Sequence, residues 1–109
     1  MRNQRFPSGS ITIHNARIGM DQLAKIGQSR VTGERIIIDP FLFPDSLQPY
    51  SFEARTAVGG GYEGTWKCRD GRSGPLKNCK FDSDRLTIAG TMVEYAFDHG
   101  FMIELDEED

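Results

Sequence analysis

Residues 50–68 read YSFEARTAVGGGYEGTWKC, and this stretch decides the fold. Apolar and small side chains fall at every second position from Tyr50 to Val58, and the alternation returns from Tyr62 to Cys68. A period of two is that of a β-strand with one buried face. The glycines at 59–61 supply the positive φ angles that a tight reversal needs. The stretch therefore predicts a β-hairpin, with Trp66 on its buried face.

A second hairpin is predicted near the C-terminus. Aromatic and β-branched residues alternate over 93–97, a turn is predicted at Asp98-His99-Gly100, and alternation resumes over 101–105. A helix over 91–99 competes with this interpretation, because Thr91 and Glu94 have the spacing of a capping box. We favour the strand, because the residues of high β-propensity share one parity and the turn leads into a matching partner.

The remaining segments extend the same pattern less clearly. Strands are expected at 11–14 and 34–39, and the spacing of Met20, Leu23 and Ala24 predicts a short helix between them. Residues 70–78 are rich in turn formers and include a proline, which predicts a loop. The expected fold is mainly β, a small antiparallel β-sandwich or β-barrel of six to eight strands with one short helix.

Length and composition indicate one domain. A chain of 109 residues is too short for two independent cores, and we expect flexible ends at about 1–9 and 106–109. No apolar run reaches the length of a membrane span, so no membrane contact is expected. Ser8-Gly9-Ser10 stands where an export signal would place its apolar stretch, which favours the cytoplasm. A disulfide between Cys68 and Cys79 and a pair of free thiols both remain open, and a reducing cytoplasm favours thiols.

Residue patterns typical of enzymes are missing from the sequence. It holds two histidines and no nucleophile-elbow, zinc-protease or phosphate-loop motif. His99 stands in the predicted turn, where most histidines are solvated. The sequence thus predicts no catalytic residues, no metal site and no cofactor.

Charge is distributed unevenly along the chain. Residues 1–80 hold twelve Lys or Arg against seven Asp or Glu, a balance of +5, whereas residues 81–109 hold one against nine, a balance of −8. These charges would cancel if the acidic strands paired beside basic ones; otherwise they form surfaces that steer a charged partner. The candidate binding residues are Arg69, Arg72, Lys77, Glu104, Asp106, Glu107 and Glu108. Nucleic acid is not the expected partner, because the chain is acidic overall and its basic loop lacks aromatic residues.

Two functions remain open. The first is a non-catalytic protein that binds another protein through its segregated charge, as inhibitors, immunity proteins and adaptors do. The second starts from the segment Tyr62-Glu63-Gly64-Thr65-Trp66, which resembles the Gly-x-Trp strand of lipocalin-like barrels over one tripeptide. That resemblance implies a small barrel with an apolar ligand in its interior. We favour the first, because a barrel of this length leaves little room for a cavity.

Overall fold

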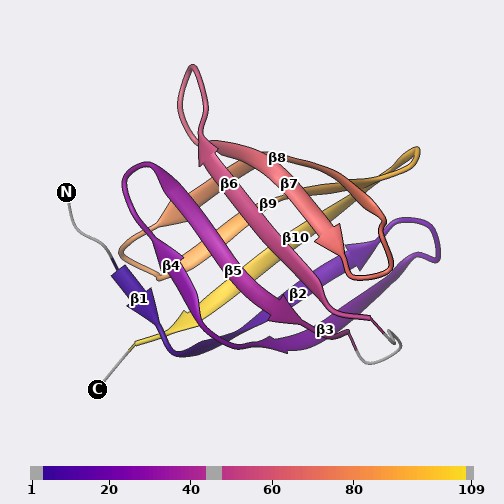
Figure 1. The fold of residues 1–109 in the computed structure, drawn as a ribbon, viewed down its shortest axis with the longest axis horizontal. Helices are drawn as coiled ribbons and strands as arrows, with labels where there is room; N and C mark the ends of the chain where they lie inside the picture. Colours follow the sequence, from indigo (N-terminus) through magenta and orange to yellow (C-terminus); the bar gives the residue numbers. More distant parts are fainter. Residues whose placement is uncertain (1–3, 44–47, 108–109) are drawn as a thin grey trace.

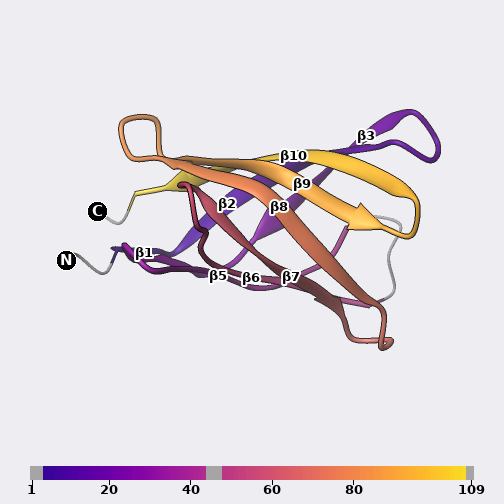
Figure 2. The ribbon, with the colours of Figure 1, turned by 90° about the horizontal axis from the view of Figure 1, so that it is seen from above.

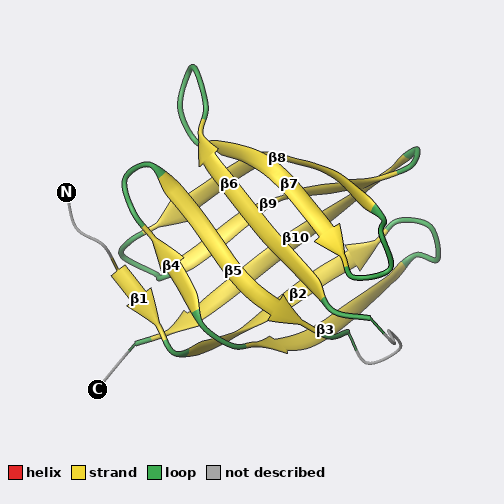
Figure 3. Ribbon diagram, in the orientation of Figure 1, coloured by secondary structure: helices red, strands yellow, loops and turns green. Residues whose placement is uncertain are grey.

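The protein is a single antiparallel sheet without helices in the parts of the chain that the computed structural model describes, residues 4–43 and 48–107 (Figures 1 and 3). The strands are β1 (Gln4–Phe6), β2 (Ser8–Asn15), β3 (Met20–Ile26), β4 (Ser29–Val31), β5 (Arg35–Phe41), β6 (Tyr50–Thr56), β7 (Tyr62–Cys68), β8 (Ser73–Asp82), β9 (Thr87–Glu94) and β10 (Phe97–Asp106). Their order in the sheet is β1-β4-β5-β6-β7-β8-β9-β10-β2-β3. The mainly-β, antiparallel expectation is confirmed.

The two ends of this strand order belong to one bent hairpin. Only Pro7 separates β1 from β2, and β3 and β4 are similarly close in the chain. The pairs Gln4↔Val31 and Gly9↔Ile26 keep one continuous register across both breaks. Because β2 also pairs with β10 and β4 with β5, the sheet curls into a flattened half-barrel (Figure 2).

The inner face of the half-barrel is filled with large apolar side chains. Trp66 is 1% exposed, as the sequence predicts, and its indole Nε1–H donates to the carbonyl of Val93 at 2.7 Å. Phe101, Ile103 and Leu105 of β10 are also buried, as their alternation predicts. The first hairpin is confirmed as well: Thr56 pairs with Tyr62, and Gly59, Gly60 and Gly61 all have positive φ.

The predicted short helix is wrong. Met20–Ile26 is strand β3, which pairs with β2 over seven residue pairs. The segment fits both a helix, through the spacing of Met20, Leu23 and Ala24, and a strand with a period of two. In the structure, Ala24 and Ile26 face the core at alternate positions, as in a strand. Extended pairing prevails because it satisfies the backbone of β2, whose Ile11 and Ile13 are buried in the core.

Two predicted reversals are misplaced. The predicted loop over 70–78 ends early, because β8 begins at Ser73 and includes Pro75. The turn former Asn78 instead has a φ of 55° where the β8–β9 register shifts, so it serves a bulge. In the second hairpin Glu94 pairs directly with Phe97, so the turn lies at Tyr95-Ala96 and not at 98–100. Because of that shift, Met92 and not Val93 is buried in β9.

The two cysteines are free thiols, and both are buried. Cys68 pairs with Tyr50 at one end of β7, whereas Cys79 pairs with Tyr62 at the other end. Six residues of extended strand separate the two positions by about 20 Å, beyond the reach of a disulfide. Burial raises the pKa of the Cys79 thiol to about 11.

This shift predicts a loss of stability at alkaline pH. A cysteine ionises near 9.0 without burial, so the unfolded chain releases the Cys79 proton before the folded protein does. The stabilising contribution is complete below pH 9 and is lost as pH rises toward 11. Urea midpoints measured at pH 8 and pH 10.5 should fall less for Cys79→Ala than for the wild type. An equal fall in both proteins would contradict this prediction.

The expected flexible ends lie partly outside the described residues, which exclude 1–3 and 108–109. Within the described part, residues 4–6 and 8–9 belong to β1 and β2, and β10 ends at Asp106. The same part of the chain contains no helix of the length and apolarity that a membrane span needs.

Candidate functional site

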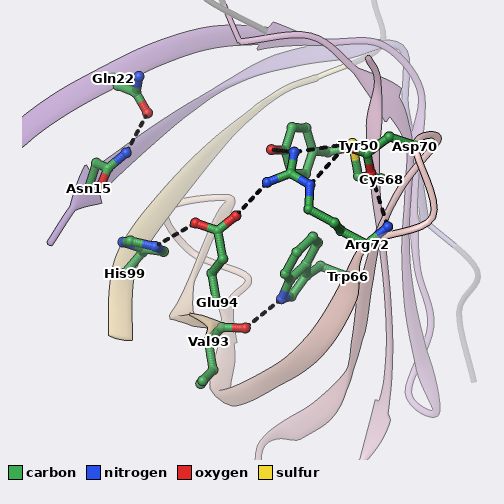
Figure 4. Close-up of polar contacts among 10 residues, drawn as sticks. All are labelled: Asn15, Gln22, Tyr50, Trp66, Cys68, Asp70, Arg72, Val93, Glu94 and His99. Carbon is green, nitrogen blue, oxygen red and sulfur yellow. Dashed lines mark hydrogen bonds and ion pairs between the residues drawn. The ribbon is translucent and has the colours of Figure 1, made fainter. Parts of the chain in front are cut away.

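A chain of polar side chains crosses one end of the half-barrel (Figure 4). It joins His99 of β10 to Glu94 at the end of β9, and Glu94 to Arg72 in the β7–β8 turn. From Arg72 it continues to Asp70 in the same turn and to Tyr50 at the start of β6. His99 is 3% exposed, so its predicted place in a solvated turn is wrong.

The tautomer of His99 follows from its two partners. The backbone N–H of Ala16 donates to Nδ1 at 2.9 Å, so Nδ1 carries no proton. The proton therefore lies on Nε2, which donates to Oε1 of Glu94 at 3.3 Å. Both ring nitrogens are engaged, and the ring ties the β2–β3 turn to β9.

The guanidinium of Arg72 is held by three oxygen acceptors and also donates to the sulfur of Cys68 at 3.8 Å. It donates from Nη1 to Oε2 of Glu94 at 2.9 Å, from Nε to Oδ2 of Asp70 at 2.8 Å and from Nη2 to the hydroxyl of Tyr50 at 2.9 Å. It also lies 5.8 Å from the centre of the Tyr50 ring, within cation–π range. Arg72 thus closes the end of the barrel and is not a free surface cation.

The electrostatics of this network follow from burial and hydrogen bonds. The backbone N–H of Arg72 donates to Asp70 and lowers the pKa of that carboxyl, while the hydrogen bond to Asp70 raises the pKa of Arg72. Burial raises the pKa of Tyr50, partly offset by the charge of Arg72. These groups therefore keep their neutral-pH ionisation states over a wide pH range.

The spaces beside and beneath the network are small. A cavity of about 40 Å³ lies against His99, Glu94 and Tyr50 and is also lined by Asn15 and Gln22. A second cavity of about 10 Å³ lies deeper, between Phe52, Ile88 and Phe101. A water molecule needs about 10–15 Å³ of such space, so the two cavities have room for a few waters and for no organic ligand. The packed and hydrogen-bonded side chains therefore close this end of the barrel.

Comparison of the chain with models of known protein families finds no match, and neither do comparisons with curated proteins and with solved structures. Functional inference therefore rests on the chain's own geometry.

The structure does not gather the predicted basic residues into one site. Arg72 turns into the network, while Arg69 is exposed in the β7–β8 turn. Lys77 is exposed on β8, where it pairs with Thr91 of β9. Neither Arg69 nor Lys77 forms an ion pair with any residue that the structure describes.

The predicted acidic residues do form one surface, which we call the acidic strip: Glu104, Asp106 and Glu107. Glu104 and Asp106 alternate on the outer face of β10, and Glu107 follows that strand directly. The hydroxyl of Ser8 donates to Asp106 at 2.7 Å. The fourth predicted residue, Glu108, lies outside the described part of the chain.

The residues that pair with the acidic strip in β2 and β9 are uncharged. Glu104 pairs with Thr87 of β9 and with Ser10 of β2, and Asp106 pairs with Ser8. In the row of Glu104 the first cation is Lys25 of β3, the partner of Ser10. Two strand spacings amount to about 10 Å, which is about one Debye length at 0.1 M salt. The acidic strand therefore does not pair beside a basic one.

Sequence reasoning missed Glu94 and His99. Both face the interior because the β9–β10 turn lies three residues earlier than predicted. The available signal was parity: across a two-residue turn, residues an odd number apart share a face, so Glu94 lies on the same face as His99, Phe101 and Ile103.

Proposed function

We propose that the chain is a non-catalytic binding protein, of the inhibitor, immunity or adaptor type, that holds a basic surface of another protein against the acidic strip. One observation carries the proposal: Glu104 and Asp106 are exposed on one face of β10, Glu104 pairs only with Thr87 and Ser10, and Asp106 pairs with Ser8. Uncompensated charge of one sign raises the rate of encounter with a surface of the opposite sign.

The barrel end supports a binding role over a catalytic one. A general base needs a nitrogen or oxygen that can take up a proton from a substrate. In His99 that nitrogen, Nδ1, already accepts the Ala16 N–H, and both oxygens of Glu94 are engaged by His99 and Arg72. These groups stabilise a rigid scaffold that presents its outer strands.

The same cavities argue against the lipocalin-like alternative. The core cavity of about 10 Å³ is enclosed by apolar side chains and has no room for a ligand. Gly64 and Trp66 carry the resemblance. Gly64 lies where the backbone of β6 comes close to β7, and Trp66 packs in the core. Packing accounts for both residues without a bound molecule.

The test measures how neutralising the acidic strip changes association. A partner is captured from the native host on immobilised protein, and its binding to purified variants is followed by surface plasmon resonance. The double variant Glu104→Gln/Asp106→Asn should lower the association rate about tenfold at low salt and change the dissociation rate little. The difference should shrink as salt is added.

The matched control removes two negative charges elsewhere. Glu63→Gln/Asp84→Asn alters exposed residues of β7 and of the β8–β9 turn, neither in an ion pair among the described residues. It should keep the wild-type association rate to within about twofold, since only net charge changes. Equal effects of the two double variants, or none from either, would contradict the proposal.

A further inference from the structure

Two pairs of arginines lie directly opposite each other in the sheet. Arg5 of β1 pairs with Arg30 of β4, and Arg35 of β5 pairs with Arg55 of β6. All four residues are exposed. Directly opposed side chains have Cβ atoms only about 5 Å apart, so like charges in such a pair destabilise it. Negative charge beside either pair would relieve this repulsion.

Carboxylates supply that charge at the second pair. Arg35 contacts Glu53 at 3.3 Å, from Nη2 to Oε1, and Arg55 pairs directly with Glu63 of β7. Two positive charges thus have two negative charges beside them in the sheet. This pair is balanced by the chain itself.

The first pair has no such balance. β1 stands at one end of the strand order, so Arg5 has only Arg30 opposite it, on the neighbouring strand β4 (Figure 1). On its other side Arg30 pairs with Ile37 of β5, an uncharged residue. Neither arginine forms an ion pair with a residue in the described part of the chain. The repulsion between these two arginines is therefore left for a bound anion to relieve.

Both arginines of the first pair line a surface hollow of about 250 Å³. Gln28 lines it as well, and its side-chain amide can donate a further hydrogen bond. Pro7 and the half-buried Ile37 add apolar wall, and the exposed Asp39 adds one carboxylate. Drug-sized ligands occupy about 300–1,000 Å³, so this hollow suits a charged group with a small body.

A wider depression of about 690 Å³ adjoins the hollow and shares Ile37 and Asp39 with it. Its charged residues are of both signs, with Asp39, Glu53 and Glu63 against Arg55 and Lys67. It has no excess of positive charge that would favour an anion. The position for an anionic group is therefore the arginine end of the hollow.

A phosphate monoester matches the two arginines in charge and in shape. It carries roughly −1.5 to −2 charge at pH 7 and has three strong acceptor oxygens. Each guanidinium presents a planar fork of donors that binds phosphate or carboxylate in a bidentate manner. A single carboxylate, with one charge and two oxygens, satisfies one arginine and leaves the other unpaired. Phosphate is thus the anion that balances both.

Asp39 sets the orientation of such a ligand. It follows Ile37 by two residues along β5, a distance of about 7 Å. Its negative charge repels phosphate from this end of the hollow, and its carboxylate can accept a hydrogen bond from a hydroxyl of the ligand. Ile37, opposite Arg30, then contacts the carbon atoms between the two ends.

We propose that Arg5 and Arg30 form a binding site for a small phosphate monoester, with the phosphate between the two guanidinium groups and a hydroxyl of its body at Asp39. The site lies on β1, β4 and β5. It uses none of the residues of the acidic strip, so the two binding surfaces stand or fall separately.

NMR titration of the whole protein tests the site. Spectra that include the arginine Nε–H signals are recorded at constant ionic strength with glycerol 3-phosphate, inorganic phosphate or acetate. Glycerol 3-phosphate should shift the signals of Arg5 and Arg30 and bind more tightly than inorganic phosphate. Acetate should bind at least about tenfold more weakly than either. Phosphates that leave both signals unmoved, or acetate that binds as well as they do, would overturn the proposal.

Single arginine exchanges separate the site from general attraction to positive charge. Arg30→Gln should weaken glycerol 3-phosphate binding at least about tenfold, since it removes charged hydrogen bonds. Arg55→Gln is the matched control, because it removes the same charge from the balanced pair, and the affinity should stay within about twofold. The spectra show whether each variant folds. Equal losses in both would indicate an adventitious ion only and would reject the site.

Asp39→Ala tests the orientation. The exchange removes a negative charge, so inorganic phosphate should bind at least as tightly as to the wild type. It also removes the acceptor for the hydroxyl, so the preference for glycerol 3-phosphate over inorganic phosphate should disappear. A preference that persists in this variant would show that the body of the ligand does not lie at Asp39, contrary to the proposal.

Discussion

Exchanging Glu94 for glutamine should lower the free energy of unfolding by about 2–3 kcal/mol. The carboxylate accepts from His99 through one oxygen and from Arg72 through the other. A glutamine can still accept from one neighbour, but its amide N–H groups then face a donor of the second. Loss of one partner of a buried ion pair costs about 3–5 kcal/mol. We expect less here because the Arg72 side chain is 39% exposed and keeps Asp70.

The control for this prediction is the same exchange in an exposed pair. Glu53 contacts Arg35 at 3.3 Å, and both side chains are about half exposed. Glu53→Gln should cost no more than about 1 kcal/mol, as exposed ion pairs do. Urea unfolding followed by Trp66 fluorescence measures both variants. If the two exchanges cost the same, the barrel-end network would not be a stabilising closure.

The part of the fold that could be predicted is the part decided locally. The hairpin over 50–68 combines a period of two with glycines that have positive φ, and both signals lie within one stretch of chain. Trp66 follows from the same parity. The pattern did not decide between a sandwich and a barrel, because the curling of the sheet depends on the breaks at Pro7 and at 27–28, where one hairpin bends to pair with both layers.

The misplaced elements were decided by pairing between distant segments. Tyr95 and Phe97 have the composition of core residues, yet Tyr95 is 80% exposed at the turn. The register between β2 and β10 fixes which side of β10 faces inward, and this register turns His99 and Glu94 toward the core. A local period cannot reveal such a register. The acidic strip, in contrast, was visible in the sequence, and the structure added that the residues paired with Glu104 and Asp106 are serine and threonine.

The glycine at position 64 illustrates how a local motif and a distant contact combine. Gly64 pairs with Ala54 of β6, and at this point the two backbones approach so closely that a Cβ atom on Gly64 would overlap the carbonyl oxygen of Glu53. The same atom would lie 2.6 Å from the Cα of Ala54. Both contacts are to backbone, which cannot rotate away as a flexible side chain can.

Gly64→Ala should therefore destabilise the protein by about 3 kcal/mol or more, the upper end of the cost of overpacking. Gly100→Ala is the matched control: it makes the same change within β10, at a position where a Cβ atom would meet no heavy atom within 4 Å. There the added methyl should be neutral or stabilise by up to about 1 kcal/mol, because it restricts the unfolded chain. Denaturant midpoints of the two variants measure the difference. If Gly64→Ala were as stable as Gly100→Ala, β6 and β7 would not approach as closely as their register requires, and the glycine of the Gly-x-Trp segment would need another explanation.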